Sequence, residues 1–542
     1  MRRRDFMKYG LMGGAIALAP QARAGQRAYS GAAARQRSAG AIDLEEITVS
    51  DLQERMESWE LTAQSLTEMY LQRIEEIDRS GPMLNSVLEI NPDALSIADA
   101  LDEERAARGP RGPLHGIPVM IKDNIDTADR MMTTAGSLAL AGSTPARDSF
   151  VAERLRDAGA VILAKTNLSE WANFRSTRSS SGWSGRGGQT RNPFALDRTP
   201  CGSSSGSGAA VSGNLCAIAI GTETDGSVVC PSSANGIVGI KPTVGLVSRS
   251  GIIPISHSQD TAGPMARTVA DAATLLGALT GVDSRDLATS QSRGHSHTDY
   301  TQFLEPNGLR GARIGVARNF FGFHERVDEL MEAAITIIET GGATIIDNAN
   351  LDNTDEYGDS EFEVMLYEFK ADLNFYLESL GPGAPVHSLA DVIAFNEANK
   401  DREMPYFGQE ILLMAEEKGP LTDQEYLDAL AKNHRLSRDE GIDKVMEEHQ
   451  LDAIIAPTDG PAWPIDLITG DHFLGGSSTP AAVSGYPSIT VPSGYIFGLP
   501  VGISFFGRPW SEPTIIRLAY AYERASRHRQ APAFLPTADL TV

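Results

Sequence analysis

The chain has 542 residues, of which 41% are hydrophobic and 22% charged, a composition typical of a globular protein with a large core. Its 47 basic and 71 acidic residues give a formal net charge of −24. That charge argues against nucleic acid or an anionic membrane surface as a partner, because both recruit Lys and Arg.

The N-terminus has the residue order of an export signal. Arg3 and Arg4 come before a short apolar run, which is followed by an A-x-A cleavage site. The paired arginines resemble the twin-arginine signal. We therefore predict a signal peptide over residues 1–24, a flexible leader over 25–42, and a periplasmic or secreted mature protein. The apolar run is too short to be a stable membrane anchor.

Hydrophobic spacing predicts alternating helices and strands in the first half of the chain. Apolar residues at helical spacing predict helices at 44–78, 92–108 and 148–158. Short apolar runs predict buried strands at 119–121, 161–164 and 217–222. This alternation favours an α/β sheet with helices on both faces.

The second half continues the alternation. Helical spacing predicts helices at 257–282, beginning after Asp260, and at 324–340. Apolar runs predict strands at 312–317, 451–457 and 488–492. Residues 355–445 are acidic and largely helical, and they contain no cluster of catalytic residue types. We therefore expect them to form a lid or a wall of the substrate pocket.

The three cysteines, Cys201, Cys216 and Cys230, are an odd number and cannot all pair within the chain. We interpret them as small buried thiols rather than as a disulfide. The sequence has no C-x-x-C pair and no H-E-x-x-H stretch, so a zinc site has little support.

Residues 200–231 carry two Ser/Gly turns, Gly202–Gly208 and Thr224–Ser227, separated by a small-residue helix and a strand. A flexible linker is the simplest alternative, but the apolar flanking segments oppose it. A phosphate loop requires a Lys after the glycines, and none is present. The G-x-S-x-G match in the first turn lacks the strand that this motif requires directly before it.

Four segments together resemble the amidase signature family. They are GPLHGIPVMIKDN, CGSSSGSGAA, GTETDGSVVCP and GIVGIKPTVGLVSR. The resemblance covers about residues 43–530, and the second and third segments are most similar to those of bacterial peptide amidases. It implies one large domain over 43–542, with a mixed, mostly central sheet covered by helices on both faces.

The resemblance also implies the catalytic residues. Lys122, Ser203 and Ser227 match the family's Ser–Ser–Lys triad, and Ser203 is expected to follow a cis peptide bond. The backbone N–H groups of Thr224, Asp225, Gly226 and Ser227 would form the oxyanion hole. The chain departs from the family at two positions, because Cys201 and Asp225 each replace a glycine.

These residue types suit amide hydrolysis without a cofactor or metal. Ser227 would attack the carbonyl carbon, and Ser203 would pass its proton to Lys122. Lys122 can accept that proton only when it is neutral, and burial at the end of an apolar strand favours the neutral form. Because the lysine supplies the base, we expect structural roles for the three histidines that could otherwise act as bases, His115, His257 and His472.

The expected substrate is a small-molecule or peptide amide, with C-terminal peptide amides favoured over general aliphatic or aryl amides. Two further functions remain as alternatives. An amidotransferase subunit acting on Glu-tRNA is opposed by the export signal and the acidic charge. A catalytically inactive periplasmic binding protein is opposed by the intact Lys–Ser–Ser set. The oligomeric state is not predicted.

Overall fold

The computed structural model describes residues 42–541. Chain contacts divide the protein into residues 1–43 and 44–542, and all the described helices and strands lie in the second unit. The predicted signal peptide, and all but the last residue of the predicted leader, lie outside the described residues.

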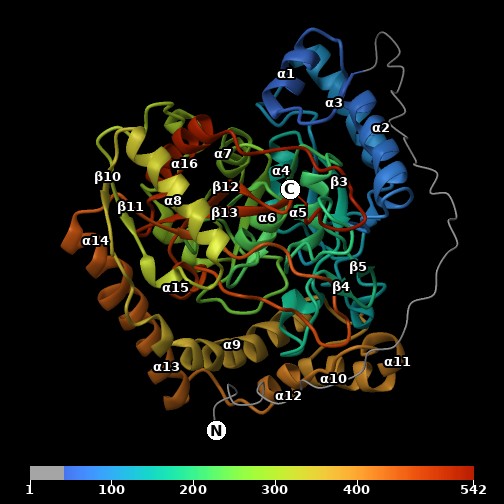
Figure 1. The fold of residues 1–542 in the computed structure, drawn as a ribbon. Coiled ribbons are helices and arrows are strands. Elements are labelled where there is room, and N and C mark those ends of the chain that lie inside the picture. The colour runs from blue at the N-terminus through green and yellow to red at the C-terminus, as the bar shows by residue number, and fades with distance from the viewer. Residues whose placement is uncertain (1–41, 542) are drawn as a thin grey trace, which may run out of the picture. The chain divides into compact units, whose positions relative to one another are not determined.

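One mixed sheet of 11 strands forms the centre of this unit (Figure 1). In spatial order its strands are β1 (Val87–Ile90), β3 (Val161–Thr166), β2 (Pro118–Lys122), β6 (Ile218–Glu223), β8 (Thr261–Ala266), β7 (Val238–Lys241), β12 (Ser488–Ile496), β13 (Leu499–Phe506), β11 (Ala453–Pro457), β9 (Arg313–Val316) and β10 (Thr344–Ile346). A separate hairpin consists of β4 (Trp183–Ser184) and β5 (Gly188–Gln189).

Strand β2 lies between β3 and β6 and is parallel to both. All five of its residues are buried, as expected for a short apolar run covered on both faces. Parallel neighbours end at the same edge of a sheet, so Lys122 at the end of β2 emerges beside Thr222 near the end of β6. Strand β8 runs antiparallel to β6 and begins at this edge, which brings Asp260 there as well.

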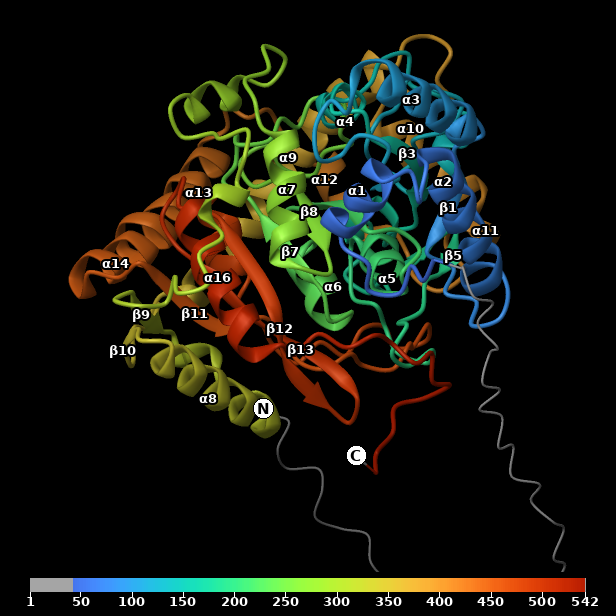
Figure 2. The same ribbon diagram turned by 90° about the horizontal axis from the view of Figure 1, so that it is seen from above.

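Helices cover both faces of the sheet. Figure 2 shows β7 and β8 between α6 and α7, and α5 packs on β6. The helices up to α8 are α1 (Val49–Glu57), α2 (Ala63–Arg73), α3 (Ala94–Arg108), α4 (Phe150–Asp157), α5 (Ser205–Ser212), α6 (Val229–Ala234), α7 (Val269–Leu279) and α8 (Glu325–Thr340).

The remaining helices are mostly those of the acidic segment. They are α9 (Gly358–Ser379), α10 (Leu389–Ala398), α11 (Lys400–Glu403), α12 (Glu410–Glu416), α13 (Gln424–His434), α14 (Asp443–His449), α15 (Thr479–Ser484) and α16 (Glu512–Ser526). Helices α9 to α13 follow one side of the sheet in Figure 1. The apolar face of α9, including Phe369 and Leu373, is buried against Trp171 and Ile253, which fixes this helix to the loops at the sheet edge.

The predicted α/β fold, a single large domain with a mixed sheet between helical layers, is confirmed. One predicted element is wrong, because residues 261–266 of the predicted helix 257–282 form strand β8. The segment TAGPMA has small residues and no alternating pattern, so its sequence does not indicate a strand. Pairing with β6 on one side and β7 on the other imposes the extended conformation.

Candidate active site

Lys122 is fully buried and its ammonium nitrogen has three recorded acceptors. Nζ lies 2.8 Å from Ser203 Oγ, 2.8 Å from Thr222 Oγ1 and 3.2 Å from the Thr222 carbonyl oxygen, within hydrogen-bond distance of each. Asn124 Nδ2 donates to the same Thr222 Oγ1 at 3.0 Å. Thr222 therefore holds the lysine nitrogen against Ser203, a role that requires β2 and β6 to be neighbours.

Burial lowers the pKa of Lys122 from 10.5 to about 7. The carboxyl groups of Asp260 and Glu223 oppose this shift, since a nearby negative charge stabilises the protonated amine. A lysine with this pKa is neutral in a substantial fraction of the molecules at neutral pH, and the neutral form can accept a proton.

Ser203 is fully buried and follows a cis Gly202–Ser203 peptide bond, as the sequence resemblance implied. Its backbone carbonyl accepts a hydrogen bond from Ser169 N at 3.1 Å. The following residues begin α5, whose eight residues are all buried. The first Ser/Gly turn is therefore followed directly by a helix that packs on β6 inside the protein.

Ser227 lies on the second Ser/Gly turn, and 8% of its surface is exposed. Its carbonyl accepts from Ser204 N at 3.2 Å, which joins the two turns. Within residues 42–541 no hydrogen bond is recorded between the Ser203 and Ser227 hydroxyl groups. Hydrogen bonds of this kind often tighten only when substrate is bound.

The turn before Ser227 presents unpaired backbone donors. In the part of the chain that the structure describes, no acceptor is recorded for the N–H groups of the four residues expected to form an oxyanion hole, Thr224, Asp225, Gly226 and Ser227. Gly226 has a φ of +79°, a conformation that glycine adopts without strain. Glu223 Oε2 accepts from the N–H groups of Val228 and Val229 at 2.7 and 3.0 Å, which secures the far side of the turn.

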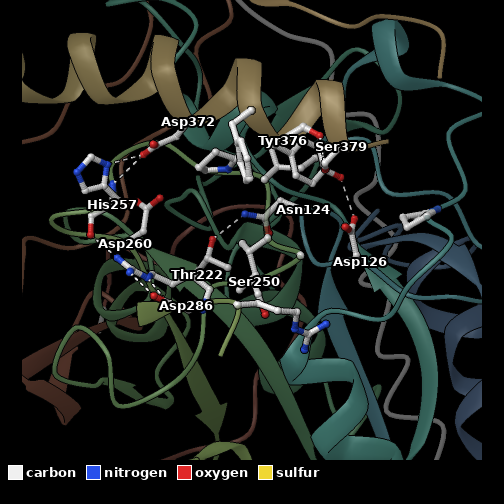
Figure 3. A pocket seen from close by; sticks show the side chains of 18 of the residues that line it. Asn124, Asp126, Thr222, Ser250, His257, Asp260, Asp286, Asp372, Tyr376 and Ser379 are labelled. Carbon is white, nitrogen blue, oxygen red and sulfur yellow. Dashed lines mark hydrogen bonds and ion pairs between the residues drawn. The ribbon is translucent and has the colours of Figure 1, made fainter. Parts of the chain in front are cut away.

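A cavity of about 680 Å³ adjoins these residues (Figure 3). Asn124, Thr222 and Thr224 line it from the sheet edge, and Ser227 is not among its lining residues. Helix α9 forms one wall through Asp372, Phe375, Tyr376 and Ser379. The cavity therefore reaches the residues that hold Lys122 rather than Ser227, the predicted nucleophile.

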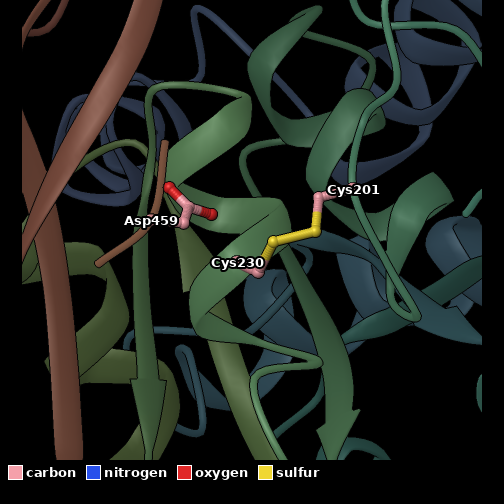
Figure 4. A group of neighbouring side chains, drawn as sticks. All are labelled: Cys201, Cys230 and Asp459. Carbon is pink, nitrogen blue, oxygen red and sulfur yellow. A yellow bond between two sulfur atoms is a disulfide. The ribbon is translucent and has the colours of Figure 1, made fainter. Parts of the chain in front are cut away.

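The prediction of three free thiols is wrong, because Cys201 and Cys230 form a disulfide and only Cys216 is a buried free thiol. Cys201 lies two residues before Ser203, and Cys230 three residues after Ser227. Their Cα atoms are 6.0 Å apart, a distance that suits a disulfide but that spacing along the chain does not show. Figure 4 shows Asp459 beside the pair, but the two sulfur atoms are bonded to each other.

Removing this disulfide is expected to destabilise the protein. The bond closes a loop of 29 residues, so Cys201→Ala/Cys230→Ala should lower the free energy of unfolding by about 3–4 kcal/mol. Urea denaturation with and without a thiol reductant measures this effect. The reductant should lower the unfolding midpoint of the unaltered protein and leave the double variant unchanged. An equal midpoint for the unaltered protein in both conditions would contradict the expectation.

None of the three histidines has a recorded hydrogen bond to the triad residues within residues 42–541. His115 is buried and its Nε2 lies 2.9 Å from the Leu101 carbonyl. His257 lies at the cavity and contacts Asp372 through Nδ1 at 2.8 Å, whereas His472 contacts Thr469 on the surface. These contacts agree with structural roles.

Similarity to known proteins identifies the family. The model of the family described as Amidase matches residues 65–516. The chain belongs to the amidase family. An Arabidopsis thaliana protein named as an amidase is 43% identical over 515 residues, which are 93% of this chain and 95% of the relative. A Schizosaccharomyces pombe protein named as an amidase is 39% identical over 522 residues, covering 91% of this chain and 87% of the relative.

Solved structures of amidases have the same fold. The native peptide amidase of Stenotrophomonas maltophilia has a TM-score of 0.86 and 53% identity, over 90% of this chain and 99% of that one. Peptide amidase PAM in complex with the competitive inhibitor chymostatin has a TM-score of 0.88 and 54% identity, again over 90% and 99%. The predictions of an amidase, and of closeness to bacterial peptide amidases, are confirmed.

The predicted location is corrected by the same comparison. Relatives of this amidase include plant and fungal amidases, which are not exported by the twin-arginine route, so the predicted twin-arginine export and periplasmic or secreted location are wrong. A twin-arginine signal directs export only where a receptor recognises it. A short run of basic, apolar and small residues does not show that such a receptor acts on this chain. No helix within residues 42–541 has both the length and the apolar character needed to cross a membrane.

Two residues of this amidase site were not assigned with any strength from the sequence. Thr222 holds Lys122 through two oxygen atoms. Asn124 follows the strand that ends at Lys122 and holds Thr222 in turn. Their positions at the ends of two predicted strands were the only available signal, since it is strand pairing that brings them together.

Proposed function

We propose that the chain removes the C-terminal amide of peptides, releasing ammonia and a peptide acid through a covalent acyl-enzyme. Ser227 Oγ attacks the amide carbonyl carbon and gives its proton to Ser203, whose own proton passes to Lys122 Nζ. The proton returns through Ser203 to the leaving nitrogen, which departs as ammonia. Water then attacks the ester by the same relay and releases the acid.

The hydrogen bond of 2.8 Å between buried Lys122 Nζ and Ser203 Oγ carries this proposal. A buried lysine without a paired carboxylate is unfavourable unless it is neutral, and a neutral amine is the base that a serine hydroxyl needs. Asp260 and Glu223 act on this lysine through their charge, but its recorded hydrogen bonds go to hydroxyl and carbonyl oxygens. Ser203, which contacts Lys122 Nζ directly, is therefore the group expected to give its proton to the lysine.

The unpaired N–H groups of Thr224, Asp225 and Gly226 support the second half of the mechanism. The tetrahedral intermediate places a negative charge on the former carbonyl oxygen, and backbone donors held in place in advance stabilise that charge. The replacement of a glycine by Asp225 leaves its backbone N–H in place. Its carboxyl group points instead to hydroxyl donors at the start of α15, Ser478 and Thr479.

Two observations favour peptide amides among the amides. The similar solved structures are titled as peptide amidases, at 53% and 54% identity. The cavity of about 680 Å³ beside the site has room for part of a peptide, and we propose helix α9, within the acidic segment 355–445, as its wall. A simple carboxamide would leave this space unused.

Ammonia release from a panel of substrates tests the proposal. Peptides with a C-terminal amide, the same peptides with a C-terminal acid, and simple aliphatic and aryl carboxamides should be compared, with Ser227→Ala as the blank. Selective release from the peptide amides is the expected result. Release only from simple carboxamides would keep the triad and overturn the peptide assignment. No release from any amide would overturn the proposed reaction.

A further inference from the structure

Asp260 directly precedes β8, and both oxygens of its carboxyl group accept hydrogen bonds. Oδ1 accepts from Thr224 Oγ1 at 2.6 Å. Oδ2 accepts from the backbone N–H groups of Ile255 and Ser256, at 2.8 and 3.0 Å. The carboxyl group therefore joins the turn before Ser227 to the loop that leads into β8, at the wall of the cavity (Figure 3).

The loop on the far side of this carboxyl group is itself fixed. Asp260 N donates to the Ser256 carbonyl at 2.8 Å, which closes a short turn. Ser256 Oγ donates to Oε2 of buried Glu368 on α9 at 2.6 Å, and Ile255 packs in the apolar cluster that this helix joins. Asp260 therefore holds Thr224 from a support that is anchored to the protein interior.

The neighbouring residue, Gln259, holds the backbone of Thr224. Its Nε2 donates to the Thr224 carbonyl at 3.3 Å and to Glu361 Oε1 on α9 at 2.9 Å. The peptide bond after Thr224 is trans, so its carbonyl and the N–H of Asp225 point in opposite directions within one plane. A contact that fixes the carbonyl direction therefore also fixes the direction of the Asp225 N–H.

The charge of Asp260 is not used in an ion pair that is recorded within residues 42–541. Burial raises the pKa of Asp260 to about 6, and the hydrogen bond from Thr224 and the charge of Arg249 act in the opposite direction. Arg249 itself is bound by Asp286, at 2.6 and 2.8 Å. The recorded contacts of this carboxylate are therefore with hydroxyl and N–H donors, and an ionised acceptor makes such hydrogen bonds stronger.

We propose that Asp260 is a positioning residue, which fixes the oxyanion-hole turn by holding the Thr224 hydroxyl. The N–H groups of Thr224 and Asp225 have no recorded acceptor among residues 42–541, so a contact that orients Thr224 orients two donors. The inference rests on the proposed function, because it requires this turn to bind the reaction's oxyanion. That charge develops only in the transition state, so the contribution should appear in kcat more than in KM.

Thr224→Val and Thr224→Ser form a matched pair that tests this contact with little change to the fold. Valine has the shape of threonine but no hydroxyl to donate, so kcat should fall by roughly 10- to 100-fold while KM changes little. Serine keeps the hydroxyl and loses only a methyl group, so its kcat should stay within roughly threefold of the unaltered enzyme.

Asp260→Ala removes the acceptor and should lower kcat at least as much as Thr224→Val does. Because both changes break one contact, the double variant should be no more than roughly threefold slower than Asp260→Ala alone. The kcat values are compared at the pH optimum of each variant, since Asp260 also acts on Lys122 through its charge. Asp271→Ala is the control, the same change at a buried carboxyl group on α7 that accepts from Val49 N at 3.0 Å, and it should leave kcat and KM unchanged.

The measurement is kcat and KM for ammonia release from an amide that the unaltered enzyme hydrolyses. An unchanged kcat in Thr224→Val, or a Thr224→Ser variant that is equally slow, would overturn the inference. A double variant that shows the product of the two single losses would overturn it as well. So would a rise in KM without a fall in kcat in Asp260→Ala, the result expected of a carboxyl group that only binds substrate in the cavity.

Failure of the proposed function gives a different result. An unaltered enzyme that hydrolyses simple carboxamides but no peptide amide would overturn the peptide assignment, and the same variants would then be compared on those carboxamides. An unaltered enzyme that hydrolyses no amide would overturn the proposed function and the positioning role of Asp260 with it.

Discussion

Ser227→Ala is expected to lower kcat for amide hydrolysis by about 10⁴- to 10⁶-fold, the range found when a serine nucleophile is removed. The hydroxyl is the atom that forms the acyl-enzyme, and no neighbouring group replaces it in the described part of the chain. Within those residues no hydrogen bond is recorded for Ser227 Oγ, so its loss leaves the fold and substrate binding nearly unchanged. Single-turnover assays of ammonia release measure the effect.

Ser232→Ala is the matched control for this change. Ser232 lies five residues further on, in α6, and its buried hydroxyl has no hydrogen-bond partner among residues 42–541. Its replacement removes the same atom from the same region without touching the proposed chemistry. Activity of Ser227→Ala within tenfold of the unaltered enzyme would show that another residue is the nucleophile.

Lys122→Met is expected to have the second largest effect, a fall in kcat of at least about 10³-fold. Methionine has a similar length and suits the buried site, but it cannot accept the proton from Ser203. General-base catalysis by a positioned group typically contributes about 10²- to 10⁴-fold. Lys444→Met, the same change at an exposed position, is the control and should retain full activity. Retention of more than a tenth of the activity in Lys122→Met would exclude the lysine as the base.

The pH dependence of the unaltered enzyme follows from the same lysine. Only the neutral amine accepts a proton, so kcat/KM should rise as pH increases through the Lys122 pKa of about 7. The folded protein releases this proton near pH 7 and the unfolded chain near 10.5, so the unfolded chain binds more protons between these values. The free energy of unfolding should therefore rise with pH in that window, and Lys122→Met should lose this part of the rise.

The apolar run before Lys122, the two Ser/Gly turns and their order along the chain were sufficient to predict a buried strand and the family. The same features gave the three triad residues, which stay a prediction. These features are local, because a strand that is buried on both faces has a continuous apolar sequence and a sharp turn requires small residues. The helical periodicity of the acidic segment 355–445 is also visible within short stretches of sequence, so its helices could be predicted. The first 24 residues show the limit of local evidence, since their composition led to a wrong location.

Contacts between distant segments were decided only by the tertiary structure. Strand β8 is extended because β6 and β7 pair with it, although its own residues do not favour that conformation. Cys201 pairs with Cys230 because the two turns meet. Gln259 donates to Glu361, 102 residues further along the chain, because α9 is packed against the sheet edge. The sequence of this protein determined which residue types stand on each turn and strand. Burial and strand order depend on the whole chain. They decided which of those residues are in contact and how far burial lowers the pKa of Lys122.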